Sequence, residues 1–267
     1  MEGTLTCRKK EIVILGAGNV ATHLAVNLAG KAHISQIYNH NIAGAQELAA
    51  KTGAEATDSL HELRRDADLY IISVKDDAIS LLAEKLKGRG GLWAHTSGSV
   101  PMDVLSPISD TYGVFYPMQT FSKDVDVDMS EVPLFIEGSD SASSDELKET
   151  ASLITKKVYD ADSERRAKLH IAAVFACNFT NRLWDISANI LKEIGLGFDT
   201  MQPLVEAMLT KAVAVTPHEG QTGPARRNDT KIIQKHLDML DGEAKELYST
   251  LSESIIRQYH PDEQNQL

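Results

Sequence analysis

The feature that most constrains the fold is a glycine-rich turn between a short apolar run and a stretch with helical periodicity. The run is Glu11–Leu15 (EIVIL), the turn at 16–21 reads GAGNVA, and apolar residues then recur up to Leu28. β-branched residues before such a turn predict a strand, and the helical period after it predicts a helix. In this context the pattern G-x-G-x-x-A favours a site for the pyrophosphate of a dinucleotide.

Each position of the turn has a physical reason under this interpretation. Gly16 permits a tight turn, Gly18 lets a pyrophosphate approach the backbone, and the small Ala21 lets helix and strand pack closely. Asn19 and Val20 open the helix, whose free N–H groups and positive dipole end favour an anion. The alternative is a glycine turn that only packs. We favour nucleotide binding, because the strand, the spacing and the following βαβ pattern agree.

Strands and helices alternate after the turn, and two Ser-x-x-Glu boxes, at Ser59 and Ser143, predict helix starts. We expect strands at 34–38, 69–74, 92–96, 113–116, 133–137 and near 158–159, with helices at 42–51, 79–86 and 143–156. From Ser163 onward the strand signals stop, and helical stretches follow at 164–194, 200–215, 230–240 and 243–259. The sequence therefore predicts an α/β domain with a doubly wound, mostly parallel sheet at 1–160 and an all-α domain at 161–267.

Composition limits the partners and the compartment. The chain has 27 Lys and Arg against 38 Asp and Glu, a net charge of −11, which disfavours nucleic acid and anionic membranes as partners. Its two cysteines, Cys7 and Cys177, are too few for a disulfide framework, and no Cys/His cluster has the spacing of a metal site. The first ten residues lack an apolar core, and no later run could span a bilayer. We expect a cytoplasmic protein without a metal.

The residues after the second strand bear on the choice of cofactor. A site that prefers NAD normally has Asp or Glu there to hold the ribose 2′-hydroxyl, whereas this chain has Asn39, His40 and Asn41. Without a carboxylate the site does not repel a 2′-phosphate, and His40 could bond to it. The sequence therefore favours NADP(H) over NAD(H), although the usual arginine is missing. The alternative for His40 is an exposed polar residue on a loop.

The next strand ends in Ser73, Val74 and Lys75. Because ligands in doubly wound sheets bind at the carboxyl ends of the strands, we expect these three residues beside the cofactor. Lys75 could meet a phosphate or the nicotinamide ribose. Asp76 and Asp77 could be paired carboxylates or metal ligands, but acidic residues are also favoured at the start of a helix, and we prefer that interpretation.

A candidate substrate site follows the strand at 92–96. Ser97, Gly98 and Ser99 form a turn whose hydroxyl and N–H groups suit a carboxylate or carbonyl, and His95 titrates in the range useful for proton transfer. The alternative is a serine-rich turn after a histidine at the strand end. We favour the site, because this turn lies at the edge of the sheet where ligands bind.

The first long C-terminal helix carries polar residues within an apolar run. At 100° per residue, His170 and Asn178 share one arc with Asn181 and Asp185, which predicts either a substrate-binding stripe or a solvated face. Farther on, Arg227 could bind a substrate carboxylate or a phosphate, or could tie helices together. We expect His170 or His95 to supply the proton for hydride transfer, with Asn178 alongside.

Six segments together resemble a family of Rossmann-like proteins with a second helical domain, labelled NADP oxidoreductases of the deazaflavin-dependent type. These segments are ILGAGNVA at 14–21, SVKDDAI at 73–79, HTSGS at 95–99, YGVFYPMQTFS at 112–122, LHIAAVFACNF at 169–179 and TGPARRND at 222–229. More distantly, the layout is similar to pyrroline-5-carboxylate reductase and to the 6-phosphogluconate and β-hydroxyacid dehydrogenases. The resemblance implies a helical domain like the C-terminal domain of 6-phosphogluconate dehydrogenase, which completes the site and often a homodimer.

Two departures limit what the resemblance carries over. The β-hydroxyacid group uses a lysine with an asparagine one turn later, but Ala172 follows Lys168 at that spacing. Asn228 stands where the closer family has glycine, and Asn tolerates the left-handed conformation best among the other residues. We expect an NADP(H)-dependent oxidoreductase acting on a small carbonyl, imine or hydroxy acid. The alternatives are a reductase that exchanges hydride between NADP and a deazaflavin, and a non-catalytic NADP-binding sensor or scaffold.

Overall fold

A computed structural model describes residues 8–261, so Cys7 lies outside the described residues. The chain separates into two compact units, with the boundary between Asn178 and Phe179. The predicted division into domains at 160/161 stays a prediction. It coincides with the end of the last strand, whereas the first unit also includes the helix that follows.

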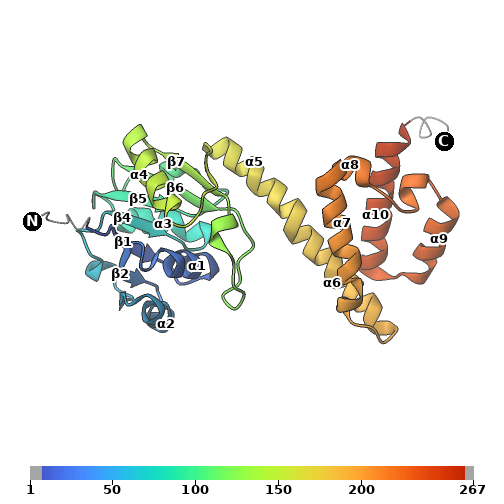
Figure 1. Ribbon diagram of the computed structural model, residues 1–267, viewed down its shortest axis with the longest axis horizontal. Helices are drawn as coiled ribbons and strands as arrows, with labels where there is room; N and C mark the ends of the chain where they lie inside the picture. The colour runs from blue at the N-terminus through green and yellow to red at the C-terminus, as the bar shows by residue number, and fades with distance from the viewer. Residues whose placement is uncertain (1–7, 262–267) are drawn as a thin grey trace, which may run out of the picture. The chain divides into compact units, whose positions relative to one another are not determined.

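The first unit is built on one eight-stranded sheet with the order β3-β2-β1-β4-β5-β6-β7-β8 (Figure 1). All neighbouring strands are parallel except β6 and β7, so the predicted mostly parallel sheet is confirmed. One strand, β3, was not predicted, because its three residues, EAT, are too few to show a period. The strands are β1 Glu11–Leu15, β2 His33–Tyr38, β3 Glu55–Thr57, β4 Leu69–Ile72, β5 Leu92–His95, β6 Tyr112–Pro117, β7 Leu134–Gly138 and β8 Val158–Asp160.

Helices connect the strands and differ from prediction mainly at their starts. The predicted box at Ser59 opens only the short 3₁₀ turn Leu60–Glu62, without a capping bond from the serine. The helix predicted from Ser143 begins instead after Asp140, whose carboxylate accepts a hydrogen bond from the Ser143 N–H (2.7 Å). The helices of this part are α1 Asn19–Leu28, α2 Ile42–Thr52, α3 Asp76–Lys85 and α4 Ser141–Ser152, and two further 3₁₀ turns are Met102–Leu105 and Met129–Glu131.

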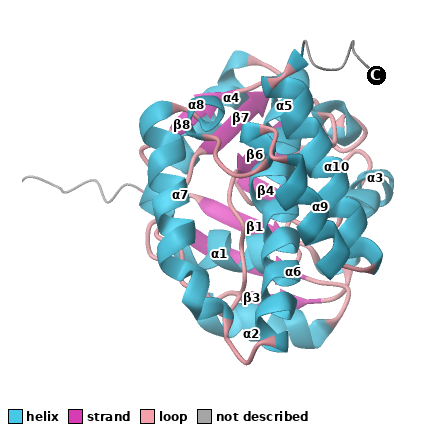
Figure 2. Cartoon of the chain, turned by 90° about the vertical axis from the view of Figure 1, so that its right-hand side faces the viewer, coloured by secondary structure: helices cyan, strands magenta, loops and turns pink. Residues whose placement is uncertain are grey.

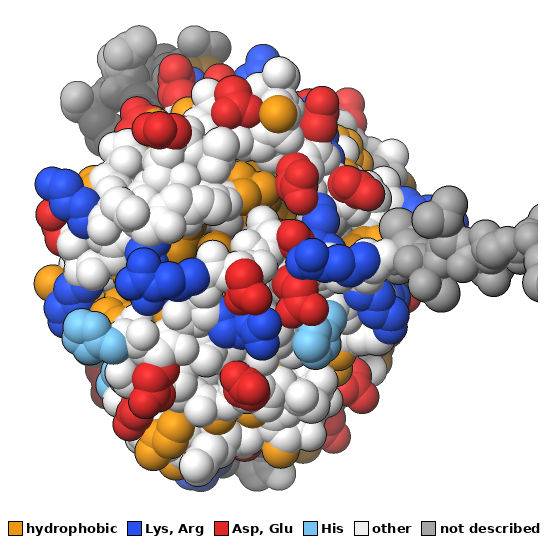
Figure 3. Space-filling view, turned by 90° about the vertical axis from the view of Figure 1, so that its left-hand side faces the viewer, with side chains coloured by type: hydrophobic (Ala, Val, Ile, Leu, Met, Phe, Trp, Pro, Cys, Tyr) orange, Lys and Arg blue, Asp and Glu red, His pale blue; other side chains and the backbone are white. Residues whose placement is uncertain are grey.

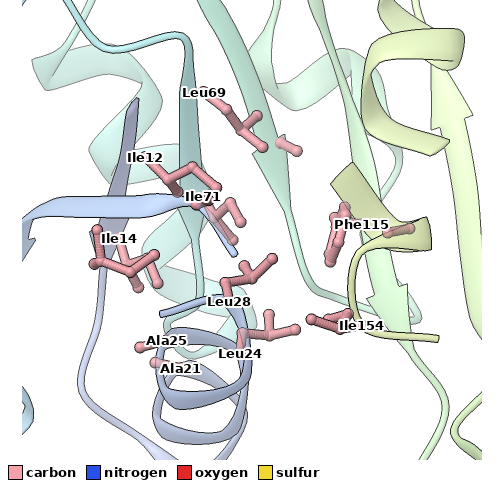
Figure 4. Close-up of a cluster of buried hydrophobic side chains, with 14 of the residues drawn as sticks. Ile12, Ile14, Ala21, Leu24, Ala25, Leu28, Leu69, Ile71, Phe115 and Ile154 are labelled. Atoms are coloured by element: carbon pink, nitrogen blue, oxygen red, sulfur yellow. The ribbon is translucent and has the colours of Figure 1, made fainter. Parts of the chain in front are cut away.

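Apolar side chains fill both faces of the sheet, as a doubly wound fold requires. On one face, Ile12 and Ile14 of β1 pack with Leu24 and Leu28 of α1 (Figure 4), in a cluster that also includes residues of α2 and α4. On the other face, Trp93 of β5 joins a second cluster with residues of α3. The sheet is therefore a rigid base for the loops at its carboxyl edge.

The second part of the chain is helical. Among the described residues every strand belongs to the sheet β1–β8, and residues after Asp160 form helices, turns and loops (Figure 2). The helix predicted at 164–194 is interrupted, because Val174–Phe179 forms a π-helical segment between α5 and α6. The helices are α5 Ser163–Ala173, α6 Thr180–Glu193, α7 Gln202–Val215, α8 Pro217–Gly220, α9 Thr230–Met239 and α10 Gly242–Tyr259, and 3₁₀ turns are Phe198–Met201 and Ala225–Arg227.

Candidate active site

The glycine turn has the geometry that its sequence predicts. Gly16 has φ +124°, and a Cβ built there would lie 2.0 Å from the carbonyl oxygen of Ser73, so that only glycine fits. Gly18 precedes α1, and a Cβ built on it would meet nothing within 4 Å. The backbone at Gly18 therefore faces open space at the positive end of α1, which is the arrangement that binds a pyrophosphate.

A loop that sequence reasoning had not assigned to the site lies against the start of α1. The Asn19 amide donates a hydrogen bond to the Phe121 carbonyl oxygen (2.9 Å), and His23 Nε2 lies 2.8 Å from the Ser122 carbonyl oxygen. The rings of His23 and Phe121 lie 4.8 Å apart. The Asn19 side chain thus holds the loop after β6, while its backbone belongs to the first turn of α1.

Asn39 and Asn41 are engaged in local structure at the end of β2. The Asn39 amide donates to the Asn41 carbonyl oxygen (2.9 Å), and the Asn41 side chain caps α2 by accepting from the Ala43 N–H (3.0 Å). His40, between them, is exposed. The described residues 39–41 contain no carboxylate that would repel a phosphate on the ribose.

The ends of β1, β4 and β5 meet at the carboxyl edge of the sheet. Ser73 is buried, its N–H donates to the Leu15 carbonyl oxygen (2.7 Å), and its hydroxyl lies 3.2 Å from that of Thr96. Val74 is half-buried and Lys75 is exposed at the N-cap position of α3. Asp76 and Asp77 occupy the first turn of α3, which agrees with the preferred interpretation that they start a helix.

His95 is buried, and both of its ring nitrogens contact the turn that follows β5. Its Nδ1 accepts from the Ser97 N–H (3.1 Å), and its Nε2 lies 3.4 Å from the Pro101 carbonyl oxygen. Burial, together with the nearby positive charge of Arg166, lowers the pKa of His95 to about 4. The ring is therefore neutral at pH 7 and helps to hold the turn. The Ser97 hydroxyl acts similarly by accepting from the N–H groups of Ser99 and Val100.

Gly98, Tyr116 and His170 come together at this turn, from three separate parts of the first unit. The Tyr116 hydroxyl at the end of β6 lies 3.1 Å from His170 Nδ1 on α5. A Cβ on Gly98 would come within 2.7 Å of His170 and 2.9 Å of Tyr116, so the missing side chain makes room for both rings. Sequence reasoning found His170 and Gly98 but not Tyr116. The signal that could have identified Tyr116 was its position at the end of a predicted strand, in the segment YGVFYPM.

A buried ion pair joins α5 to the same turn. Arg166, which is 1% exposed, pairs with Glu137 of β7 and donates to the Val100 carbonyl oxygen (2.6 Å). Glu137 also accepts hydrogen bonds from Ser163 at the start of α5. These bonds fix the first turns of the helix that carries His170 against the turn at 97–100.

Among the described residues of the first unit, no hydrogen bond or ion pair joins the Asn178 side chain to this cluster, and Arg227 belongs to the other unit. Asn178 is exposed in the π-helical segment, where each turn contains more residues than an α-turn, so the segment interrupts the helical period from which the arc of His170, Asn178 and their neighbours was predicted. Arg227 is exposed in the second unit. Their predicted roles stay predictions. The turn around Arg227 forms as expected, with Asn228 at φ +53° and Asp229 capping α9.

Residues 8–261 hold no group of three or more His, Cys, Asp or Glu side chains placed to bind a metal ion. Over the same range, no helix is both long and apolar enough to cross a membrane. Figure 3 shows Lys and Arg interspersed with Asp and Glu on one face, rather than a continuous basic surface that could follow a nucleic acid.

Comparison with known proteins agrees with this arrangement. The Rossmann-like domain model matches residues 2–118, and the model of DUF2520, a domain of unknown function, matches residues 132–255. The crystal structure of BF3122 from Bacteroides fragilis, a "putative NADP oxidoreductase", is 45% identical, with a TM-score of 0.88 over 93% of this chain and 98% of that one. The chain belongs to the family of this Bacteroides protein. No curated protein matches the chain.

More distant structures share the fold of the Bacteroides family. A reductive aminase from Aspergillus terreus in complex with NADPH and ethyl-5-oxohexanoate is 15% identical, with a TM-score of 0.68 over 94% of this chain and 95% of that one. The 1-pyrroline-5-carboxylate reductase of Streptococcus pyogenes is 13% identical, with a TM-score of 0.61 over 93% and 97%. The predicted resemblance to Rossmann-like proteins with a helical C-terminal domain is confirmed.

Proposed function

We propose that this protein is an NADP(H)-dependent oxidoreductase that transfers hydride to or from a small carbonyl, imine or hydroxy-acid substrate. The observation that carries the proposal is the glycine turn, where Gly16 fits only as glycine and Gly18 leaves the backbone open at the start of α1. Membership of the Bacteroides oxidoreductase family supports it, at 45% identity over nearly the whole chain.

The residues present fit a bound dinucleotide. Gly18, Asn19 and Val20 would offer backbone N–H groups to the pyrophosphate, and residues 39–41 would lie by the adenosine ribose. Ser73, Val74 and Lys75 would lie beside the nicotinamide half, because β4 ends next to β1. The absence of a carboxylate at 39–41 supports NADP(H) over NAD(H). When bound, this cofactor would supply or accept the hydride.

Reduction of a carbonyl or imine needs a proton on the substrate oxygen or nitrogen in addition to the hydride. We propose that the cluster of Gly98, Tyr116 and His170 supplies this proton. In the reductive direction we assign the donor role to the Tyr116 hydroxyl, with His170 Nδ1, 3.1 Å away, restoring its proton. Burial raises the pKa of Tyr116, the charge of Arg166 lowers it, and the charge of Asp76 raises it. The net pKa is raised, so the phenol keeps its proton at neutral pH. His95 is a weaker candidate, since its side chain is 0% exposed and both of its ring nitrogens are engaged with the turn at 97–101. Ser97, Gly98 and Ser99 would line the substrate side.

Replacing Tyr116 tests the donor assignment. We expect Tyr116→Phe to slow NADPH oxidation with a responsive substrate about 100-fold or more, which is the size of a general-acid contribution, while NADPH affinity changes less than about twofold. Tyr112→Phe is the matched control, because Tyr112 lies on the same strand and its hydroxyl bonds to Asp103 rather than to His170. Equal rates for Tyr116→Phe and the control would remove Tyr116 from the mechanism.

We also propose a cytoplasmic homodimer with small-molecule ligands. Large apolar side chains are exposed on α7, including Leu204 (67%), Leu209 (63%) and Val213 (81%), and soluble proteins rarely leave such a surface to water. A twofold contact between two copies would cover it. Cys177 is exposed and free, which suits a reducing compartment.

The function is tested by following NADPH absorbance with the purified protein and a panel of ketones, cyclic imines and 2-oxo acids. We expect at least one panel member to be reduced with oxidation of NADPH in equal amount. If NADPH binds but no panel member or deazaflavin oxidises it, a sensor without turnover replaces the enzyme.

A further inference from the structure

A cleft of about 680 Å³ opens beside the end of β2 and shares no lining residue with the glycine turn at 16–21 or with the cluster of Gly98, Tyr116 and His170. Its walls come from Tyr38 at the end of β2, from the segment 58–61 with Arg65, and from the segment 85–89 that ends α3 and follows it. The volume is within the usual range for sites that bind small molecules. The roles proposed above for the hydride-transfer site use none of the residues that line this cleft.

The walls of the cleft are strongly basic in an acidic protein. Arg65, Lys85, Lys87 and Arg89 line it, whereas Asp58 is the one acidic residue among its lining residues. The four cations take part in none of the ion pairs among residues 8–261, although the adjacent Arg64 pairs with Asp66. Three net positive charges therefore gather at this place in a chain whose net charge is −11.

Arg89 is held in place inside this cleft by the backbone. Its guanidinium donates to the carbonyl oxygens of Leu60 (3.2 Å) and Leu63 (3.4 Å). Burial lowers the pKa of Arg89, and the positive charge of Arg65 lowers it further. The two guanidinium groups therefore repel each other, and an anion bound next to both would offset this repulsion.

We propose that this cleft binds a phosphate group, with Arg65, Lys87 and Arg89 as its cationic contacts. Guanidinium groups match phosphate oxygens in both charge and shape, and a fixed Arg89 loses little freedom on binding. The phosphate belongs either to a free phosphorylated metabolite or to the 2′-phosphate of the cofactor, since Tyr38 ends β2, where the adenosine ribose is expected. The first source does not rest on the proposed function.

The test uses two double variants of the full chain that remove the same charge. The double variant Arg65→Gln with Lys87→Gln replaces two cationic side chains of the cleft by neutral ones. Arg64→Gln with Lys51→Gln is the control, because neither residue lines the cleft and both pair with surface acids. Binding of inorganic pyrophosphate is measured by calorimetry, and binding of NADPH and NADH by fluorescence, all at low salt.

We expect pyrophosphate or NADPH to bind the cleft variant about tenfold or more weakly than the control. Weaker pyrophosphate binding with unchanged NADPH affinity identifies a free metabolite, and weaker NADPH binding with unchanged NADH affinity identifies the cofactor phosphate. Equal affinities of the two variants for both pyrophosphate and NADPH overturn the proposal. If neither nucleotide binds the wild type, the proposed function fails, while pyrophosphate still decides the cleft.

Discussion

Two glycines two residues apart have different physical roles, and single substitutions separate them. Gly16→Ala forces a side chain against the Ser73 carbonyl oxygen at a φ of +124°, and we expect it to cost about 2 kcal/mol or more of unfolding free energy. Gly18→Ala meets open space, so the loss stays near 1 kcal/mol or less while NADPH affinity falls. Denaturant unfolding and NADPH fluorescence check both. A Gly18→Ala variant that binds NADPH as tightly as the wild type contradicts the role of this residue.

His95 should make the stability depend on pH. Its folded pKa is about 4, below the ordinary value of 6.5, so the unfolded chain binds more protons between these pH values. The contribution of His95 to the free energy of unfolding is therefore fully present above pH 6.5 and is lost as the pH falls towards 4. At 1.36 kcal/mol for each pH unit, it amounts to about 3 kcal/mol.

His95→Asn isolates this contribution, because an amide oxygen can still accept from the Ser97 N–H and does not titrate. Urea unfolding at pH 7 and pH 4.5 should show a smaller loss of stability in the variant than in the wild type. The same loss in both proteins would mean that His95 is not held neutral.

At the scale of elements, the start of α5 depends on the buried pair of Arg166 and Glu137. Arg166→Met leaves the Glu137 carboxylate, which is only 13% exposed, without its ion-pair partner, and we expect a loss of about 3 kcal/mol. Adding Glu137→Met should restore much of this loss, since apolar replacements of both partners are often close to neutral. Chemical unfolding of the single and double variants checks the coupling. A double variant less stable than Arg166→Met would contradict it.

Elements with long periodic patterns could be predicted from the sequence, and short or interrupted ones could not. The strand, turn and helix at 11–28 were predictable because apolar period and glycine spacing agree. The π-helical segment at 174–179 was not, since its residues continue an ordinary helical pattern. In the candidate site, His170 was found from its residue type. Tyr116 and Arg166 were missed, because their meeting depends on contacts between β6, β7 and α5 that spacing along the chain does not encode.

At the scale of the whole molecule, the exposed face of α7 predicts association. Leu204→Glu places a charge where we expect the partner copy, and should convert dimers to monomers in analytical ultracentrifugation. Leu81→Glu is the control, because Leu81 is 56% exposed on α3, far along the chain from the proposed contact. A wild-type protein that sediments as a monomer at micromolar concentration would contradict the proposed dimer.

The account as a whole depends on a phosphorylated dinucleotide binding at the glycine turn. Fluorescence titration of the purified wild-type protein with NADPH and with NADH tests this most directly. We predict saturable binding of both, with NADPH bound at least about tenfold more tightly, because residues 39–41 present no carboxylate to its 2′-phosphate. Binding of neither nucleotide, or tighter binding of NADH, would contradict the account.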